Sequence, residues 1–84
     1  MILKYIIVED QVPVVFALKP LSHISVANNL GKVVSAGFCK IMPQQDWVKV
    51  ICFGRSMTLD IESHEMEDNI ILENLFNTGF ESLL

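Results

Sequence analysis

The sequence predicts a small α+β domain with a mainly antiparallel sheet and two helices packed on it, in the order ββαβββα. Three observations predict this class. Runs of β-branched and aromatic residues alternate with short turn sequences along most of the chain. Two stretches, residues 22–31 and 65–77, instead carry apolar residues at helical spacing. The length of 84 residues fits one unit, so we expect a single domain over residues 1–84.

The first two strands are expected at residues 2–8 and 12–18. The first, ILKYIIV, is apolar at both alternating sets of positions, which is typical of a strand that is central or covered. The second begins VPV, and a proline cannot donate a ladder hydrogen bond. Pro13 therefore belongs at the beginning of its strand or on the edge of the sheet.

A short helix is expected between Ser22 and Gly31. Serine is a favoured N-cap, and glycine is a favoured left-handed terminator. His23 is interpreted as a structural histidine facing the sheet; the alternative is a general base or a metal ligand, although no second His or Cys stands nearby at ligand spacing. The stripe expected to face the sheet consists of His23, Val26, Ala27 and Leu30.

Residues 32–42 and 47–53 predict a hairpin around the turn sequence PQQD. With the turn centred on Gln44 and Gln45, Cys39 pairs with Val50 and lies diagonal to Cys52, too far for an easy disulfide. One face of this hairpin is then uniformly small or apolar. We expect a helix to cover that face.

The opposite face of the hairpin is the first candidate interaction surface. It combines aromatic and aliphatic side chains with two lysines, a composition that indicates a contact surface. Lys40 directly opposite Lys49 would cost stability unless anions or water solvate the pair. The members of this surface are Phe38, Lys40, Met42, Trp47, Lys49, Ile51 and Phe53.

The stretch SMTLDI predicts one more strand, residues 56–61, with Met57 inward and Ser56 outward. The last helix is expected over residues 65–77, with Ser63 as its N-cap and an end at Gly79. The adjacent residues Ser63, His64 and Glu65 do not predict a catalytic triad. In such triads the members converge from separate segments of the chain.

The charge is unevenly distributed along the chain. Residues 1–59 carry six basic and three acidic residues, a net +3, whereas residues 60–84 carry seven acidic residues and no Lys or Arg, a net −7. The simplest interpretation is a solvated acidic helix beside a mildly basic sheet. The alternative is a surface that binds a basic partner or mimics nucleic-acid phosphates. Its candidate residues are Asp60, Glu62, Glu65, Glu67 and Asp68.

Two apolar residues of the last helix lie off its main stripe. Met66 and Ile70 fall among the polar positions of the helix, whereas the stripe itself is formed by Ile71, Leu72, Leu75 and Phe76. The first two either tuck under the edge of the sheet or contact another chain.

Several functional classes find no motif in the sequence. We predict no catalytic residues, no metal and no cofactor, because no glycine-rich phosphate loop and no zinc-type spacing of Cys and His occurs. No apolar run approaches the roughly 18–20 residues that span a bilayer, so no membrane association is expected. The start MILKYIIVED lacks the features of a secretory signal, and Cys39 and Cys52 look unpaired, which favours the cytoplasm.

Four short segments, in order, resemble a family of small proteins encoded by bacteriophages and prophages, for which no activity is known. They are LSHISVANNLG, KVVSAGFCKI, CFGRSMTLDIES and EDNIILENLF. The resemblance covers residues 21–75, and its pattern is a His-x-x-Val-Ala helix, a Ser-Ala-Gly-Phe strand and a Gly-x-Ser-x-Ser/Thr-Leu strand. It implies a phage or prophage origin and the cytoplasm of a bacterial host, and it implies no catalytic residue or cofactor.

The function predicted from these observations is that of a small, non-enzymatic accessory protein that binds another macromolecule. We expect it to form a homo-oligomer, most simply a homodimer, and a host protein is a further possible partner. The first alternative is an inhibitor of a nucleic-acid-handling host protein, acting through the acidic segment. The second is weak nucleic-acid binding through Lys40, Lys49 and Trp47, which the net charge of −4 disfavours.

Overall fold

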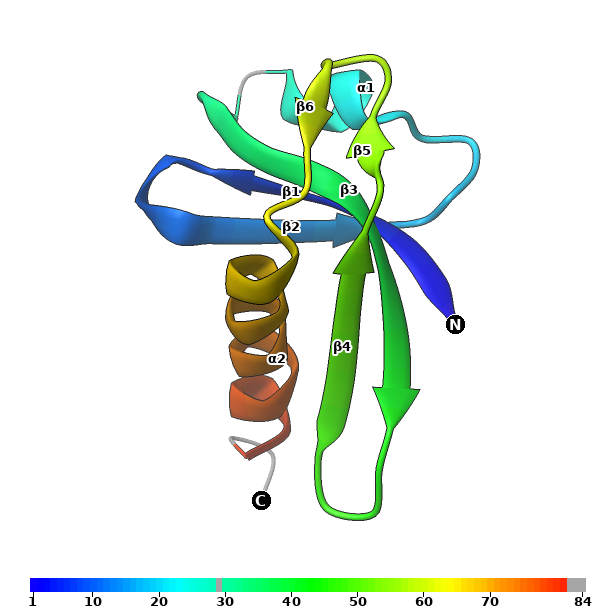
Figure 1. Cartoon of the computed structure of the whole chain (residues 1–84), viewed down its shortest axis with the longest axis vertical. Coiled ribbons are helices and arrows are strands. Elements are labelled where there is room, and N and C mark those ends of the chain that lie inside the picture. The colour runs from blue at the N-terminus through cyan, green and yellow to red at the C-terminus, as the bar shows by residue number, and fades with distance from the viewer. Residues whose placement is uncertain (29, 82–84) are drawn as a thin grey trace.

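The computed structural model describes residues 1–28 and 30–81, and it confirms the α+β class (Figure 1). Four antiparallel strands form one sheet in the order β2-β1-β3-β4, and β5 and β6 form a separate short hairpin. The elements are β1 (Ile2–Val8), a 3₁₀ turn (Glu9–Gln11), β2 (Val12–Phe16), α1 (His23–Ala27), β3 (Val33–Pro43), β4 (Val48–Phe53), β5 (Arg55–Ser56), β6 (Ile61–Glu62) and α2 (Glu65–Glu81).

The first strand, β1, lies inside the sheet and is buried on both faces, as predicted. On one face Tyr5 and Ile7 pack beneath α2, in a cluster that contains Leu72. On the other face Ile6 and Val8 pack in a second cluster, which includes residues of α1. Pro13 lies in β2, an edge strand of the sheet, and this confirms the position expected for a residue without an N–H donor.

The helix α1 is capped as predicted but is shorter than expected. The Ser22 hydroxyl accepts the Ser25 backbone N–H at 3.3 Å, and the Ser25 hydroxyl accepts the Ser22 N–H at 3.1 Å, so the two serines form a capping box. Gly31 has a φ of +107°, the left-handed region that glycine tolerates. The helix nevertheless ends at Ala27, and Leu30 is exposed instead of facing the sheet.

The single strand expected at residues 56–61 is wrong. The chain forms the β5–β6 hairpin there, with a turn over residues 57–60. The Ser56 hydroxyl, expected outward, is buried and accepts the Leu59 N–H at 3.1 Å, whereas Met57 is exposed. Asp60 adopts a φ of +55°, which a short polar side chain tolerates. A serine that caps a turn therefore prevails over the alternating pattern.

The helix α2 begins at Glu65, and two expectations about its ends are wrong. Ser63 is not its N-cap, because the Ser63 hydroxyl donates to the Gly54 carbonyl at 2.7 Å and so ties α2 to the end of β4. Gly79 does not end the helix, which continues to Glu81. Figure 1 shows α2 running beside β4 along the side of the sheet.

Side chains of α2 close the free edge of β4. Four helical residues advance about 6 Å and two strand residues about 6.6 Å, so residues one helical turn apart can meet alternate residues of a strand. Three α2 side chains accept β4 backbone N–H groups in this way, and the Asn77 amide also donates to the Val48 carbonyl at 3.0 Å. The pairs are Asn69 with Cys52 at 2.6 Å, Glu73 with Val50 at 2.9 Å, and Asn77 with Val48 at 2.8 Å.

Candidate functional site

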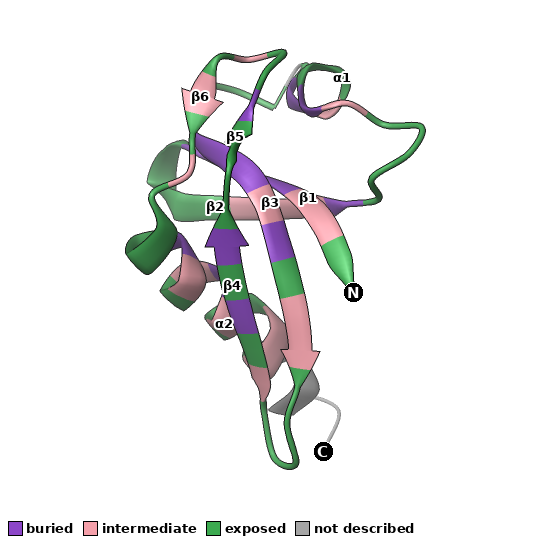
Figure 2. Cartoon of the chain, turned by 45° about the vertical axis from the view of Figure 1, so that its right-hand side comes forward, coloured by how far each residue is buried: buried purple, intermediate pink, exposed green. Residues whose placement is uncertain are grey.

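The β3–β4 hairpin has one covered face and one open face. Residues 39, 41, 50 and 52 join the cluster beneath α2, so the residues between them project to the opposite side. Figure 2 shows the resulting alternation of buried and exposed residues along β4. Ile51 and Phe53 are 38% and 37% exposed. We call this side the outer face, and it consists of Phe38, Lys40, Met42, Lys49, Ile51 and Phe53.

The pairing predicted across the outer face is wrong by two residues, although the residues on the face are the predicted ones. Lys40 lies opposite Ile51, and Met42 lies opposite Lys49. The turn is centred one residue later than expected, with the Gln44 N–H donating to the Trp47 carbonyl at 2.7 Å. The two lysines are therefore not directly opposed, and each stands beside an apolar side chain. A two-residue shift keeps every side chain on its face.

Trp47, the remaining member of the predicted surface, lies in the turn before β4 and not in the strand. It is about half exposed and borders a small hollow formed by the turn residues themselves. The turn therefore places an aromatic side chain at the far end of the hairpin from Phe53.

The end of the outer face nearest α1 is a group of packed rings. Phe38 and Phe53 stack with centroids 5.8 Å apart, and His23 meets Phe38 and Phe16 edge-on at 5.6 Å each. The His23 Nε2 donates to the Gly37 carbonyl at 2.7 Å, since a carbonyl can only accept. Burial lowers the pKa of His23, so the ring is neutral at pH 7. The contacts of His23 therefore fit its interpretation as a structural histidine.

Asp68, one of the predicted acidic-surface residues, is instead buried between α2 and the sheet. It is 2% exposed. Its Oδ2 accepts the Tyr5 phenol at 2.5 Å, the Ser35 hydroxyl, and the His64 backbone N–H at 2.9 Å. Burial, followed by the bond to Asp68, raises the pKa of Tyr5 above its usual value, so the phenol stays a donor. Asp68 therefore anchors the start of α2 to β1 and β3.

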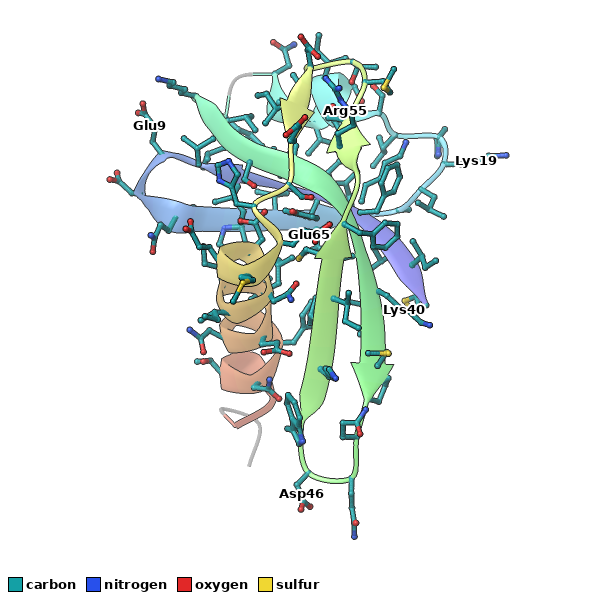
Figure 3. All side chains as sticks on the ribbon, viewed as in Figure 1. Glu9, Lys19, Lys40, Asp46, Arg55 and Glu65 are labelled. Carbon is teal, nitrogen blue, oxygen red and sulfur yellow. The ribbon has the colours of Figure 1, made fainter. Side chains whose placement is uncertain are left out.

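The remaining predicted acidic residues divide into two groups. Asp60 forms a salt bridge with Arg55. This pair lies near the β5–β6 hairpin, far from Asp46 at the tip of the β3–β4 turn (Figure 3). Glu62, Glu65 and Glu67 are exposed, and among the described residues none of the three forms a salt bridge. The free acidic surface is thus smaller than the sequence suggested.

The two cysteines face each other directly across β3 and β4, and their expected diagonal placement is wrong. Both are free and buried. Burial raises the pKa of Cys39 to about 11 and that of Cys52 to about 12. Both side chains are therefore thiols at neutral pH and not the thiolates that act as nucleophiles.

The partners of Asp68 were missed in the sequence, although a signal for them existed. Asp68 lies one helical turn before Leu72, on the stripe that faces the sheet, so its carboxylate had to meet a donor there. Tyr5 and Ser35 are the hydroxyl residues of the paired strands β1 and β3 that face α2. Aligning the helix stripe with these two hydroxyls would have located the network.

Two general properties complete the description of the site. Across residues 1–28 and 30–81 no group of three or more His, Cys, Asp or Glu side chains is arranged to hold a metal ion. Nor does this part of the chain contain a helix with the length and apolar character to cross a membrane. Comparison with models of known protein families, with curated proteins and with solved structures finds no match.

Proposed function

We propose that this chain is a non-enzymatic binding protein whose outer face contacts another macromolecule, self-association included. The observation that carries the proposal is the contrast between the two faces of one hairpin. The face beneath α2 buries its apolar side chains, and side chains of α2 accept the backbone N–H groups at the β4 edge. The outer face leaves Ile51 and Phe53 more than one-third exposed beside two lysines. Exposed apolar side chains gathered on one face are typical of an interaction site.

The composition of the outer face favours a protein partner over a small ligand. Small-molecule sites are concave and enclose most of their ligand. The outer face is instead a two-stranded surface with aromatic side chains at one end and lysines between aliphatic ones. Aromatic residues are enriched at protein interfaces, where lysine usually occupies the rim. Together with the resemblance to phage and prophage proteins, this supports an accessory role in a bacterial cytoplasm.

The acidic segment supports a second candidate function, inhibition of a nucleic-acid-handling protein. Glu62, Glu65 and Glu67 are exposed without a salt bridge, and no Lys or Arg follows Arg55 in the sequence. Asp60 and Asp68 are engaged within the chain, so only part of the predicted charge is free to imitate phosphates. Replacing the three glutamates by glutamine should abolish binding that depends steeply on salt. Unchanged binding would remove this candidate.

Site-specific cross-linking in the producing cell tests the first proposal. A photoreactive phenylalanine analogue replaces Ile51 on the outer face, and the control replaces Ile24, an isoleucine on α1 that is more exposed than Ile51. We expect defined adducts from position 51 that are absent from position 24. Mass spectrometry then identifies the captured molecule as a protein or a nucleic acid. Identical products from both positions would contradict the proposal, and a nucleic-acid adduct would replace it with direct nucleic-acid binding.

A further inference from the structure

The outer face continues from the hairpin onto β1. In β1, Tyr5 joins the cluster beneath α2, so the alternate residues Ile2 and Lys4 project to the opposite side. The register agrees, because Ile2 is paired with Lys40 of the outer face. Lys4 is paired in the same way with Phe38. The open side of the sheet therefore spans three strands, and the exposed Ile2 belongs to it.

Three lysines form a diagonal row across this side, one on each strand. Lys40 lies two residues along β3 from Phe38, the partner of Lys4. Lys49 is paired with Met42, which lies two residues further along β3. Each step combines one strand spacing of about 4.8 Å with two residues of about 6.6 Å, so neighbouring Cα atoms of the row are about 8 Å apart. The whole row is then about 16 Å long.

The lysine row has no opposite charge beside it within the chain. Lys40 and Lys49 are exposed, and Lys4 is partly buried, with its Nζ donating to the Leu21 carbonyl at 2.7 Å. In residues 1–28 and 30–81, none of the three lysines forms a salt bridge, and the strand residues that share this side include no Asp or Glu. The acidic residues of α2 belong to a helix that packs on the other face of the sheet, and Figure 3 shows Lys40 across the hairpin from that helix.

Apolar side chains flank the row on both of its sides. Ile2 and Met42 lie on one side of the row, and Phe38 and Ile51 lie on the other. An apolar partner that covered these side chains would also bury the ammonium groups between them without a counter-charge, which is strongly unfavourable. A partner that covers this surface favourably therefore places carboxylates along the row.

We propose that the partner of the outer face is an acidic α-helix of another protein, which lies along the lysine row. A helix with its side chains is about 10 Å wide, enough to cover the row and the apolar side chains on both sides of it. Three turns advance about 16 Å, the length of the row, so acidic residues on successive turns reach all three lysines. An extended segment presents a single line of side chains to the sheet and leaves the flanking apolar groups uncovered. The inference rests on the proposed function and names its partner.

A protein helix fits this side better than a single-stranded nucleic acid does. Bases bind such surfaces by stacking on free aromatic rings. Phe38 and Phe53 stack on each other, and His23 meets Phe38 edge-on, so ring surface that bases would need is already in contact. The aliphatic side chains beside the row have no apolar counterpart on a phosphodiester backbone, and the net charge of −4 repels a polyanion.

Fluorescence anisotropy with labelled peptides and the whole chain tests the inference. The probe is a peptide of about 16 residues, long enough to be helical, with Glu on successive turns and Leu on both sides of that line. The matched peptide carries Gln in place of every Glu. We expect the Glu peptide to bind more tightly by about tenfold or more, and we expect this difference to shrink as the salt concentration rises.

Two variants of the chain locate the bound peptide. Lys40→Gln, at the centre of the row, should weaken binding of the Glu peptide about tenfold. The control is Lys32→Gln, because Lys32 is exposed just before β3, about 26 Å of extended strand from Lys40. It should leave binding unchanged. Circular dichroism of both variants confirms that the fold is retained.

Several results would overturn the inference. These are equal affinities for the two peptides, equal losses in the two variants, and no binding of the Glu peptide at concentrations up to about 1 mM. A labelled oligothymidylate that binds more tightly than the Glu peptide would replace the helix with a nucleic acid.

The cross-linking experiment separates this inference from the proposed function. If position 51 captures a protein while the two peptides bind alike, the acidic helix is wrong and the binding function stands. The same holds if the captured protein is a second copy of this chain. If position 51 captures nothing and neither peptide binds, both fail.

Discussion

The two faces of the β3–β4 hairpin use alternate residues of the same two strands, yet one face is buried and the other is partly exposed. On the covered face, Cys39, Val50 and Cys52 are almost completely buried against α2. On the outer face, Ile51 and Phe53 remain partly exposed, although they are at least as apolar. Hydrophobicity therefore does not distinguish the faces. The covered face is the one to which α2 is fastened.

Polar side chains hold α2 against the covered face. Asp68 ties the start of the helix to Tyr5 and Ser35, while Asn69, Glu73 and Asn77 follow the β4 edge. The outer face has no comparable polar partner among the described residues, and its lysines point to solvent. The difference teaches that buried hydrogen bonds select where an amphipathic helix packs, while the apolar area supplies much of the free energy.

Removing the Asp68 carboxylate should have the largest effect on this asymmetry. Asp68→Ala leaves the buried Tyr5 phenol without its acceptor, and it removes one of two acceptors from the Ser35 hydroxyl and from the His64 backbone N–H. We expect the free energy of unfolding to fall by about 3–5 kcal/mol, because hydrogen bonds to a buried carboxylate are lost and the Tyr5 phenol is left unsatisfied. Urea denaturation followed by Trp47 fluorescence measures it. The control is Glu67→Ala, an exposed neighbour in the same helical turn, which should cost less than about 1 kcal/mol. Equal losses would contradict the anchor.

Trimming the apolar side chains on the two flanks of α2 should produce the next largest difference. Leu72→Ala opens a cavity beneath the sheet and should cost about 3 kcal/mol. Ile70→Ala, on the side of α2 turned away from the sheet, should change the stability of the monomer by about 0.5 kcal/mol or less, because that side chain is mostly solvated. Both variants are measured by the same denaturation at low protein concentration. A large loss for Ile70→Ala would mean that its flank is packed within the chain.

The closed edge of β4 gives a smaller, local prediction. Asn77→Ala removes an acceptor for the Val48 N–H and a donor to the Val48 carbonyl. We expect a loss of about 1 kcal/mol and faster hydrogen exchange at the Val48 amide, which lies at the start of the strand. Asn74→Ala is the control, because Asn74 is an exposed asparagine of the same helix and is not among the residues that hydrogen-bond to β4. Unchanged protection of Val48 would show that the edge is closed by something other than Asn77.

The parts of the fold that depend on side-chain periodicity could be predicted from the sequence. The central position of β1, the capping of α1 by Ser22 and the division of the hairpin into two faces follow from alternation and from capping rules. The β3–β4 register could not be fixed, because Gln44, Gln45 and Asp46 suit several turns equally and a two-residue shift preserves both faces.

Features that depend on a partner distant in sequence were beyond local rules. Ser63 looks like a helix cap until Gly54 is placed beside it, and Asp68 looks like a surface acid until Tyr5 lies beneath it. The outer face was predicted residue by residue, apart from Trp47, because its members need only the strand period.

The smallest expected effect comes from His23, which packs against Phe16 and Phe38 at the end of the outer face nearest α1. Its pKa is lowered below the usual value of about 6.5 by burial, so the folded state binds a proton less readily than the unfolded chain. At pH 8 the protonation of His23 has no effect on the free energy of unfolding. That free energy declines as the pH falls below about 6.5 toward the lower pKa of the folded state. His23→Gln should flatten this decline between about pH 7.5 and pH 5. His64→Gln, which removes the other histidine of the chain, an exposed one, is the control. Parallel slopes in the two variants would mean that His23 is protonated without cost, and that the ring cluster with Phe16 and Phe38 opens to solvent.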